Sequence, residues 1–303
     1  MAAPSQRLNI YDAVAANRWR TVALIGVFTA IVSLLAYFGG EYFAPGGGVA
    51  LLPFAVGFSG LSAATSYFAG DKLVLAQSQA RELAEHEQPQ LRNIVETLAI
   101  GLGVQPPKLY VIDDTAPNAF ATGRDPKHAS IAVTRGLLEK LDRTELEGVI
   151  AHEMSHVVNR DIRVMLLVTV LVGTVVLISD GMLRFGGGRR RGGRDNGAGI
   201  IALIAIVLAI VTPIIATLIQ LAVSRQREYL ADASGALLTR YPTGLANALR
   251  KISADPEALE VANKATASLY FANPLKDAPR FMDGIFNTHP PIAERVRRLE
   301  AMG

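Results

Sequence analysis

The chain has 303 residues, a formal net charge of +3 and no cysteine. Without cysteine there are no disulfides or thiolate metal ligands, so any bound metal must be held by His, Asp or Glu. Half of the residues are hydrophobic, and a mean hydropathy of +0.28 is too apolar for an ordinary soluble domain. The weak net charge gives no indication of a nucleic-acid partner.

Four long apolar runs dominate the chain, and each is long enough to cross a bilayer as a helix. They are residues 21–39, 46–69, 164–183 and 198–223. The alternative is a set of buried core helices, but four such runs in one chain favour membrane helices. The first run exceeds the usual apolar length of a cleaved signal peptide, which favours an uncleaved anchor.

Charges beside the first two runs predict the orientation in the membrane. Arg7, Arg18 and Arg20 precede the first run, Glu41 lies between the two runs, and Lys72 follows the second. By the positive-inside rule, the N-terminus and the chain after Lys72 should be cytoplasmic. We therefore expect a cytoplasmic segment at 1–20 and two transmembrane helices at 21–70. A further domain at 71–303 would follow, interrupted by a hydrophobic helical hairpin at 164–223.

The polar part of the chain predicts a mainly α fold with a small β-sheet. Apolar spacing predicts a helix over 91–102, which Gly and Pro residues terminate. Short strands are predicted at 108–113, 118–122 and 130–134, the last two joined as a hairpin. A short helix begins near Gly136. The stretch Thr144–Glu147 then predicts a capping box that opens the next helix.

That next helix contains VIAHEMSHVVNRD, residues 149–161. His152 and His156 are four positions apart, so both imidazoles lie on one helical face and can bind one cation. Glu153 lies beside that face, where it can accept a proton from a water molecule that the metal activates. The alternative is a surface helix with two solvated histidines.

A third ligand is predicted in SRQREYLAD, residues 224–232. Glu228 and Asp232 share a helical face. Glu228 is the predicted third ligand, and Asp232 is expected to accept the free N–H of a ligating histidine. The alternative is an amphipathic helix in which Arg225 and Arg227 pair with these two carboxylates.

AHEMSH followed by SRQREYLAD resembles the HtpX-type membrane zinc endopeptidases, relatives of the CaaX prenyl proteases in which the third ligand is glutamate. NAFATG, the hydrophobic segments between the motifs and THPPIAER extend the resemblance over residues 15–300. It implies a zincin-like domain, with an active-site helix beside a short sheet, that binds one zinc ion per chain. The ligands would be His152, His156 and Glu228, with Glu153 as catalytic base.

The resemblance also assigns a substrate-binding edge strand and two further catalytic residues. An extended peptide would pair with the strand, whose residues are Asn118, Ala119, Phe120, Ala121 and Thr122. His289 and Arg295 would stabilise the oxyanion. The alternatives are an ordinary sheet strand, and a loop and C-terminal helix in which His289 caps or packs.

The resemblance implies misfolded or unassembled membrane proteins as substrates, in quality control and stress response at the bacterial inner membrane. A CaaX-type processing protease, or a membrane scaffold or transporter with a structural metal, is the alternative.

Five arginines between the third and fourth runs, at 184, 189–191 and 194, argue by the positive-inside rule against a hairpin that fully spans the membrane. Length favours spanning. A partly inserted hairpin, or arginines that bind anionic lipid, are the other possibilities. The sequence indicates no oligomeric state.

Overall fold

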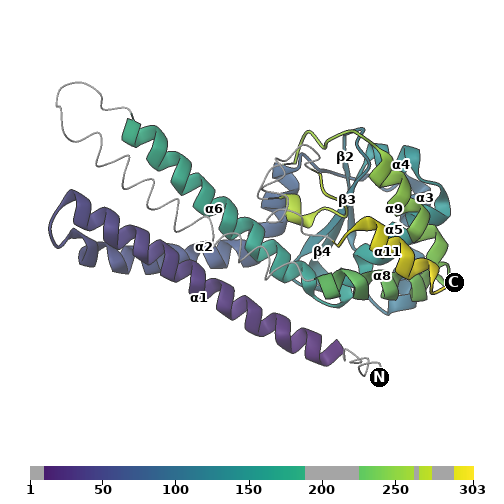
Figure 1. The fold of residues 1–303 in the computed structure, drawn as a ribbon, viewed down its shortest axis with the longest axis horizontal. Coiled ribbons are helices and arrows are strands. Elements are labelled where there is room, and N and C mark those ends of the chain that lie inside the picture. Colours follow the sequence, from purple (N-terminus) through teal and green to yellow (C-terminus); the bar gives the residue numbers. More distant parts are fainter. Residues whose placement is uncertain (1–9, 188–224, 263–265, 275–289) are drawn as a thin grey trace.

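Two regions make up the computed structural model, which describes residues 10–187, 225–262, 266–274 and 290–303. Long helices form an elongated bundle on one side, and a four-stranded sheet with its surrounding helices forms the other (Figure 1). The predicted fold class, mainly helical with a small sheet, is confirmed.

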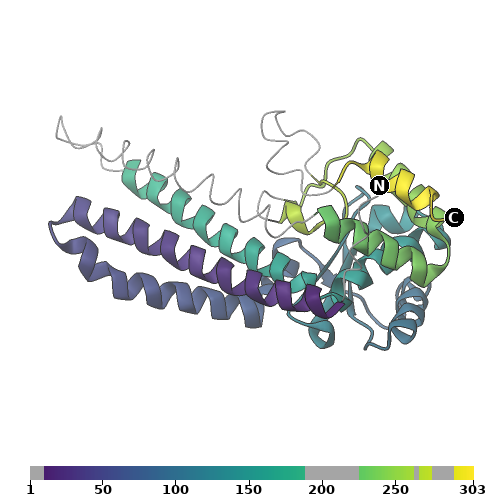
Figure 2. The ribbon, with the colours of Figure 1, turned by 60° about the horizontal axis from the view of Figure 1, so that its bottom comes forward.

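The bundle consists of α1 (Ile10–Phe43), α2 (Gly47–Gln77) and α6 (Asp161–Gly187). The three helices run side by side away from the sheet region, and α1 begins next to that region (Figures 1 and 2). The first three apolar runs lie in these helices. The fourth run, 198–223, falls outside the described residues.

The turn between α1 and α2 depends on glycine. Gly46 has φ +80°, a left-handed conformation that residues with a Cβ atom rarely adopt. A Cβ atom on Gly48 would lie 2.4 Å from the carbonyl oxygen of Tyr37. Larger residues at Gly48 would therefore push the two helices apart.

The bundle is apolar on its inner and outer faces. Inside, Phe28 of α1 packs in one cluster with Leu167 and Leu171 of α6. Outside, α2 exposes Leu61 and Phe68. The segments Trp19–Glu41 and Gly47–Gln77 are both long and apolar enough to cross a membrane. Large exposed apolar surfaces are rare on soluble monomers, and a lipid environment accounts for this one.

The sheet has the strand order β1-β2-β4-β3, and its strands are β1 (Arg81–Glu82), β2 (Lys108–Ile112), β3 (Ala119–Gly123) and β4 (Ala129–Thr134). The predicted hairpin of β3 and β4 is confirmed, with the short helix η1 (Pro126–His128) in its connection. The sequence did not predict β1 or the parallel pairing of β2 with β4. Because β3 pairs only with β4 in the sheet, it is an edge strand.

Helix α5 (Arg143–Val158) packs against β3 and against α3, α8 and α9, and the remaining helices lie around this core. The helices around α5 are α3 (Pro89–Leu102), α4 (Arg135–Lys140), α8 (Arg225–Thr239), α9 (Pro242–Ala254), η2 (Ala267–Leu269) and α11 (Ile292–Glu300). Two glycines permit the close packing. A Cβ atom on Gly148 would lie 2.7 Å from the Leu245 nitrogen, and one on Gly235 would lie 3.0 Å from the His152 nitrogen.

The capping box that opens α5 differs from the prediction. Asp142 is the N-cap, and its carboxylate accepts the N–H groups of Thr144 and Glu145, while Glu145 accepts the N–H of Asp142. The predicted capping box Thr144–Glu147 was wrong by two positions, because the helix begins at Arg143, two residues earlier than an N-cap at Thr144 would place it. Asp142 supplies the same acceptor chemistry as a threonine.

Candidate metal centre

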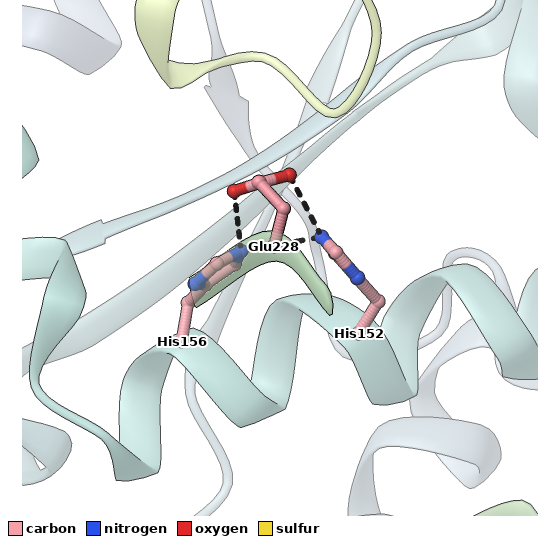
Figure 3. A group of neighbouring side chains, drawn as sticks. All are labelled: His152, His156 and Glu228. Atoms are coloured by element: carbon pink, nitrogen blue, oxygen red, sulfur yellow. Dashed lines mark hydrogen bonds and ion pairs between the residues drawn. The ribbon is translucent and has the colours of Figure 1, made fainter. Parts of the chain in front are cut away.

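Two helices that are far apart in the sequence bring three metal-ligating side chains together (Figure 3). His152 and His156 come from α5, and Glu228 comes from the first turn of α8. Their ligand atoms all lie within 4.8 Å of one another, and all three residues are buried. The Nε2 atoms of the two histidines are 3.2 Å apart, and His156 Nε2 is 3.4 Å from a Glu228 carboxylate oxygen.

The donor set fits zinc. Zinc binds imidazole nitrogen at about 2.0–2.1 Å in tetrahedral geometry, which places two such nitrogens roughly 3.3 Å apart. The observed separation of 3.2 Å matches this value. Two imidazole nitrogens and one carboxylate also leave the open position that a catalytic zinc site requires.

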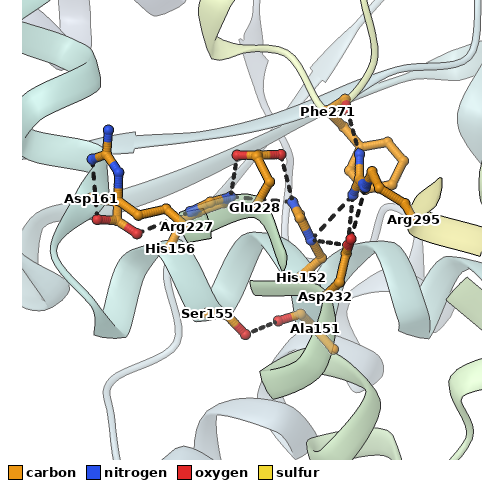
Figure 4. A network of polar contacts seen from close by, with 10 residues as sticks. All are labelled: Ala151, His152, Ser155, His156, Asp161, Arg227, Glu228, Asp232, Phe271 and Arg295. Atoms are coloured by element: carbon orange, nitrogen blue, oxygen red, sulfur yellow. Dashed lines mark hydrogen bonds and ion pairs between the residues drawn. The ribbon is translucent and has the colours of Figure 1, made fainter. Parts of the chain in front are cut away.

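His152 is oriented from behind by Asp232 and Arg295 (Figure 4). Its Nδ1 lies 3.0 Å from an Asp232 oxygen, so Nδ1–H donates to the carboxylate and Nε2 presents its lone pair to the site. Arg295 binds Asp232 through two nitrogens, at 2.9 and 2.7 Å. Burial lowers the pKa of His152 to about 4, and the charge of Arg295 acts in the same direction. The imidazole is therefore neutral, as a ligand must be.

His156 has a separate partner, Asp161, the first residue of α6. His156 Nδ1 lies 3.3 Å from one Asp161 oxygen, and Arg227 Nη1 lies 3.4 Å from the other. Burial lowers the pKa of His156, but the Asp161 hydrogen bond and the charge of Glu228 outweigh it and raise this pKa to about 9. The carboxylates around His156 thus favour positive charge at the site, whether a proton or a metal ion.

The charges of the buried side chains also favour a divalent cation. Among the described residues at the site, four carboxylates and two guanidinium groups are buried or nearly so, a difference of two negative charges. The carboxylates are Glu153, Asp161, Glu228 and Asp232, and the guanidinium groups are Arg227 and Arg295. Buried charge is costly unless it is compensated. A divalent ion between His152, His156 and Glu228 would balance the difference.

Glu153 is buried beside the three ligands without belonging to their group. The negative charge of Glu153 is one of the interactions that raise the pKa of His156 and the pKa of Arg295. A carboxylate beside the ligands, rather than among them, can accept a proton from a water molecule at the site.

The predicted substrate strand is the sheet edge nearest to α5, and all five residues of β3 are buried. Thr134 N–H donates to Asn118 C=O, so the alternation of an antiparallel pair turns the N–H and C=O groups of Ala119, Ala121 and Gly123 outward. The segment 270–272 pairs with the beginning of this edge. Phe271 N–H donates to Ala119 C=O at 2.8 Å.

The side chain of Asn118 holds the same segment in place. Its Oδ1 accepts the N–H groups of Ala119 and Ala272, and its Nδ2 donates to Ala272 C=O. The edge therefore has two parts: Ala119 is paired with the chain itself, whereas Ala121 and Gly123 lie beyond that pairing. Direct peptide binding by Asn118 remains a prediction.

The other two predicted catalytic residues have different outcomes. His289 lies outside the described residues. Arg295 is fully buried at the site, but its guanidinium group binds Asp232 and lies 3.5 Å from His152 Nδ1, on the side of the ring opposite to Nε2. This geometry favours orientation of His152 over contact with a reacting carbonyl.

Asp161 and Phe271 were not predicted. The Phe271 ring lies 5.1 Å from the His152 ring and 4.9 Å from the Arg295 guanidinium carbon. Asp161 follows His156 by five positions, and the expectation that a ligating histidine donates to a carboxylate could have identified it. Phe271 lies in an irregular segment where no periodic signal exists.

Comparisons with known proteins agree with this site. The model of the family described as peptidase family M48 matches residues 85–303. The chain belongs to this family. It is 46% identical over 297 residues to a Protease HtpX homolog of Dictyoglomus thermophilum, covering 97% of this chain and 95% of that protein. A Protease HtpX homolog of Tropheryma whipplei is 45% identical, with coverage of 97% and 99%.

A solved structure supports the fold. The crystal structure of S. mikatae Ste24p matches with a TM-score of 0.50 and 20% identity, covering 93% of this chain and 66% of that chain. The chain thus spans about two thirds of the Ste24p chain, and the likeness shows the fold. With the family and the helices of the bundle, these findings identify a membrane metalloprotease.

Proposed function

We propose that the protein is a zinc-dependent endopeptidase that binds one zinc ion through His152, His156 and Glu228. The observation that supports this most strongly is the convergence of three buried ligand atoms within 4.8 Å, with separate carboxylates behind both histidines. Zinc is the metal that this mixed imidazole and carboxylate set suits best in a hydrolase.

In this proposal, Glu153 is the general base. Zinc held by His152, His156 and Glu228 would act as a Lewis acid and would lower the pKa of a water molecule toward neutrality. Glu153 accepts the proton as the water oxygen bonds to the scissile carbonyl carbon, and then delivers it to the departing amine as the C–N bond breaks. Asp232 and Asp161 keep both imidazoles in the tautomer that presents Nε2. Arg295 holds Asp232 as a positioning residue.

The substrate peptide is proposed to pair with the outer edge of β3, centred on Ala121. Backbone hydrogen bonds do not depend on the side chains of the substrate, so we expect little preference for particular substrate sequences. Proline at Ala121 would remove an outward N–H and distort the edge. Proteolysis should fall while metal content stays unchanged. Normal cleavage by this variant would exclude this edge from the substrate path.

The proposed location is the bacterial inner membrane, with the metalloprotease domain of residues 71–303 in the cytoplasm. Arg20 lies in the N-terminal half of α1 and Lys72 in the C-terminal half of α2, the halves that adjoin the sheet region, and the positive-inside rule assigns that side to the cytoplasm. Residues 1–20 and 21–70 would be the cytoplasmic segment and the transmembrane helices. The proposed substrates are misfolded or unassembled membrane proteins.

The test separates a catalytic metal from a structural one. Glu153→Gln should retain zinc and lose proteolysis of casein by about 100-fold or more, because only the proton acceptor is removed. His152→Ala should lose both zinc and proteolysis. Metal content and cleavage are measured on the full chain in detergent or nanodiscs. Cleavage by Glu153→Gln at the parental rate would overturn the assignment of the base.

A further inference from the structure

Exposed aromatic residues occur at two levels along α1. Trp19, the only tryptophan in the chain, is 75% exposed and lies in the half of α1 that begins near the sheet region. Tyr37 and Phe38 form an edge-to-face pair toward the other end. At about 1.5 Å per residue, positions 19 and 38 lie about 28 Å apart. This matches a hydrocarbon core of about 30 Å, and aromatic residues concentrate at its two boundaries.

Helix α2 carries aromatic residues at the level nearer the sheet region. Tyr67 and Phe68 contact each other edge to face, and Phe68 is 65% exposed. Position 67 lies about 30 Å from Gly47, the first residue of α2. Two helices of the bundle therefore give similar estimates for the membrane boundary beside the catalytic region.

Two arginines from other elements meet these aromatic residues. The guanidinium carbon of Arg124, in the connection after β3, lies 5.9 Å from the centre of the Phe68 ring. That of Arg163, in the first turn of α6, lies 5.6 Å from the Tyr67 ring. Arg163 Nε donates to Arg124 C=O at 2.8 Å, which fixes the two arginines side by side. We call Tyr67, Phe68, Arg124 and Arg163 the collar.

The charge of the collar is only partly balanced by the residues around it. Arg124 has Asp125 at 3.7 Å, a long distance for an ion pair. Among the residues that the structure describes, the recorded partners of Arg163 are a carbonyl oxygen and an aromatic ring, and neither carries a formal charge. Lys72 adds a further exposed positive charge one turn beyond Phe68.

We infer that the collar binds the head groups of anionic phospholipids at the cytoplasmic surface of the membrane. Guanidinium groups bind phosphate through paired N–H donors, and their aliphatic stems pack on apolar and aromatic surface. The aromatic rings lie at the head-group level, where their apolar faces contact acyl chains. Basic side chains at this depth attract anionic lipid over zwitterionic lipid.

The collar also places one end of β3 at the membrane. Arg124 directly follows Gly123, the last residue of β3, so the part of the edge beyond the segment 270–272 is the part nearest the lipid. If the proposed function holds, a peptide segment that emerges from the bilayer meets Gly123 and Ala121 first. The substrate class is then polypeptide at the membrane surface.

The test measures lipid preference at the collar without using proteolysis. A single reporter is made by Trp19→Phe with Phe68→Trp, and the full chain is reconstituted in phosphatidylcholine nanodiscs. Brominated phosphatidylglycerol or brominated phosphatidylcholine is then added at equal mole fraction, and quenching of the tryptophan fluorescence gives their relative affinities. We expect phosphatidylglycerol to be favoured about five-fold or more.

Matched variants assign the preference to the two arginines. Arg124→Gln with Arg163→Gln should reduce the ratio to about one, whereas lysine at both positions should retain most of it. The control is Arg143→Gln with Arg250→Gln, which removes two exposed arginines whose side-chain partners are Asn93, Asn247 and Glu300. It should leave the ratio unchanged. Equal quenching by the two lipids in the parent, or an unchanged ratio in the glutamine variant, would overturn the inference.

A separate measurement distinguishes this inference from the proposed function. The Glu153→Gln variant should keep the full preference for phosphatidylglycerol, because Glu153 lies outside the collar. A lipid preference without any proteolysis by the parent would support the collar and refute the endopeptidase. Proteolysis by the parent without a lipid preference would support the endopeptidase and refute the collar.

Discussion

Helices α2 and α5 break the usual rule of burial in opposite ways. Helix α2 exposes large apolar side chains, among them Leu61 and Phe68, whereas α5 buries His152, Glu153 and His156. Each departure would be destabilising for a polypeptide alone in water. Each calls for a partner that is not polypeptide: membrane lipid for α2, and the proposed metal ion for α5. Residues at unusual burial thus indicate what the chain must bind.

One continuous helix, α6, connects the bundle to the metal centre. Asp161, which contacts His156, is the first residue of α6, and Leu167 and Leu171 of the same helix pack in the bundle cluster. The helix that lies beside α1 and α2 therefore begins at the metal centre. Packing in the bundle therefore helps to set the position of the Asp161 carboxylate beside His156, a proposed metal ligand.

The largest expected effect is loss of a metal ligand. Glu228→Gln removes the charged ligand atom, so metal affinity should fall by more than the roughly 10–100-fold that outer-shell changes cause, and proteolysis should be lost. Zinc content after dialysis against a graded chelator measures this. Asp113→Asn, an exposed carboxylate outside the site, is the control. Unchanged zinc affinity in Glu228→Gln would move the third ligand elsewhere.

Two leucines with similar exposure test the difference between the regions directly. Leu61 in α2 is 68% exposed and Leu237 in α8 is 72% exposed. Leu61→Arg should cost about 3 kcal/mol in membrane insertion, whereas Leu237→Arg should change stability by less than about 0.5 kcal/mol. Membrane-inserted fractions and thermal unfolding of both variants measure this. Equal tolerance of arginine at both sites would contradict a lipid-facing α2.

An intermediate effect is expected for Asp161. Asp161→Asn removes the negative charge that orients His156, and zinc affinity should fall by about 10–100-fold. Saturating zinc should restore most of the proteolysis, because the three ligands and Glu153 remain. Competition with a chromogenic chelator gives the affinity. An affinity equal to that of the parent would remove Asp161 from the metal centre.

The smallest effect is expected at an exposed ion pair. The Arg81 hydrogen bond and the Ala84 N–H lower the pKa of Glu87 to about 2. Because the folded pKa is below the unfolded value, the stabilisation is present above about pH 4.5 and is lost as pH falls through about 2. Solvent makes the contribution small. Hydrogen exchange at Ala84 should be more acid-sensitive in the parent than in Glu87→Gln, and equal sensitivity would exclude this pair.

Short-range patterns in the sequence predicted several of the helices and strands and the pair of histidines at the site. Apolar run lengths predicted α1 and α2, and alternation with turn residues predicted the hairpin of β3 and β4. The pair His152 and His156 lies on one helical face by geometry alone. Glu228 was predicted only as one of two readings, because its helix could equally have formed surface ion pairs.

Long-range packing decided the rest. That Glu228 faces both histidines depends on the close approach of α8 to α5, which Gly235 permits. That residues 270–272 cover the beginning of β3, and that Arg124 and Arg163 meet two aromatic residues of α2, depends on segments far apart in the sequence. Helical and strand periodicity report which face of an element is apolar. They do not report which other element contacts it, so pairings between distant segments emerge only in the folded chain.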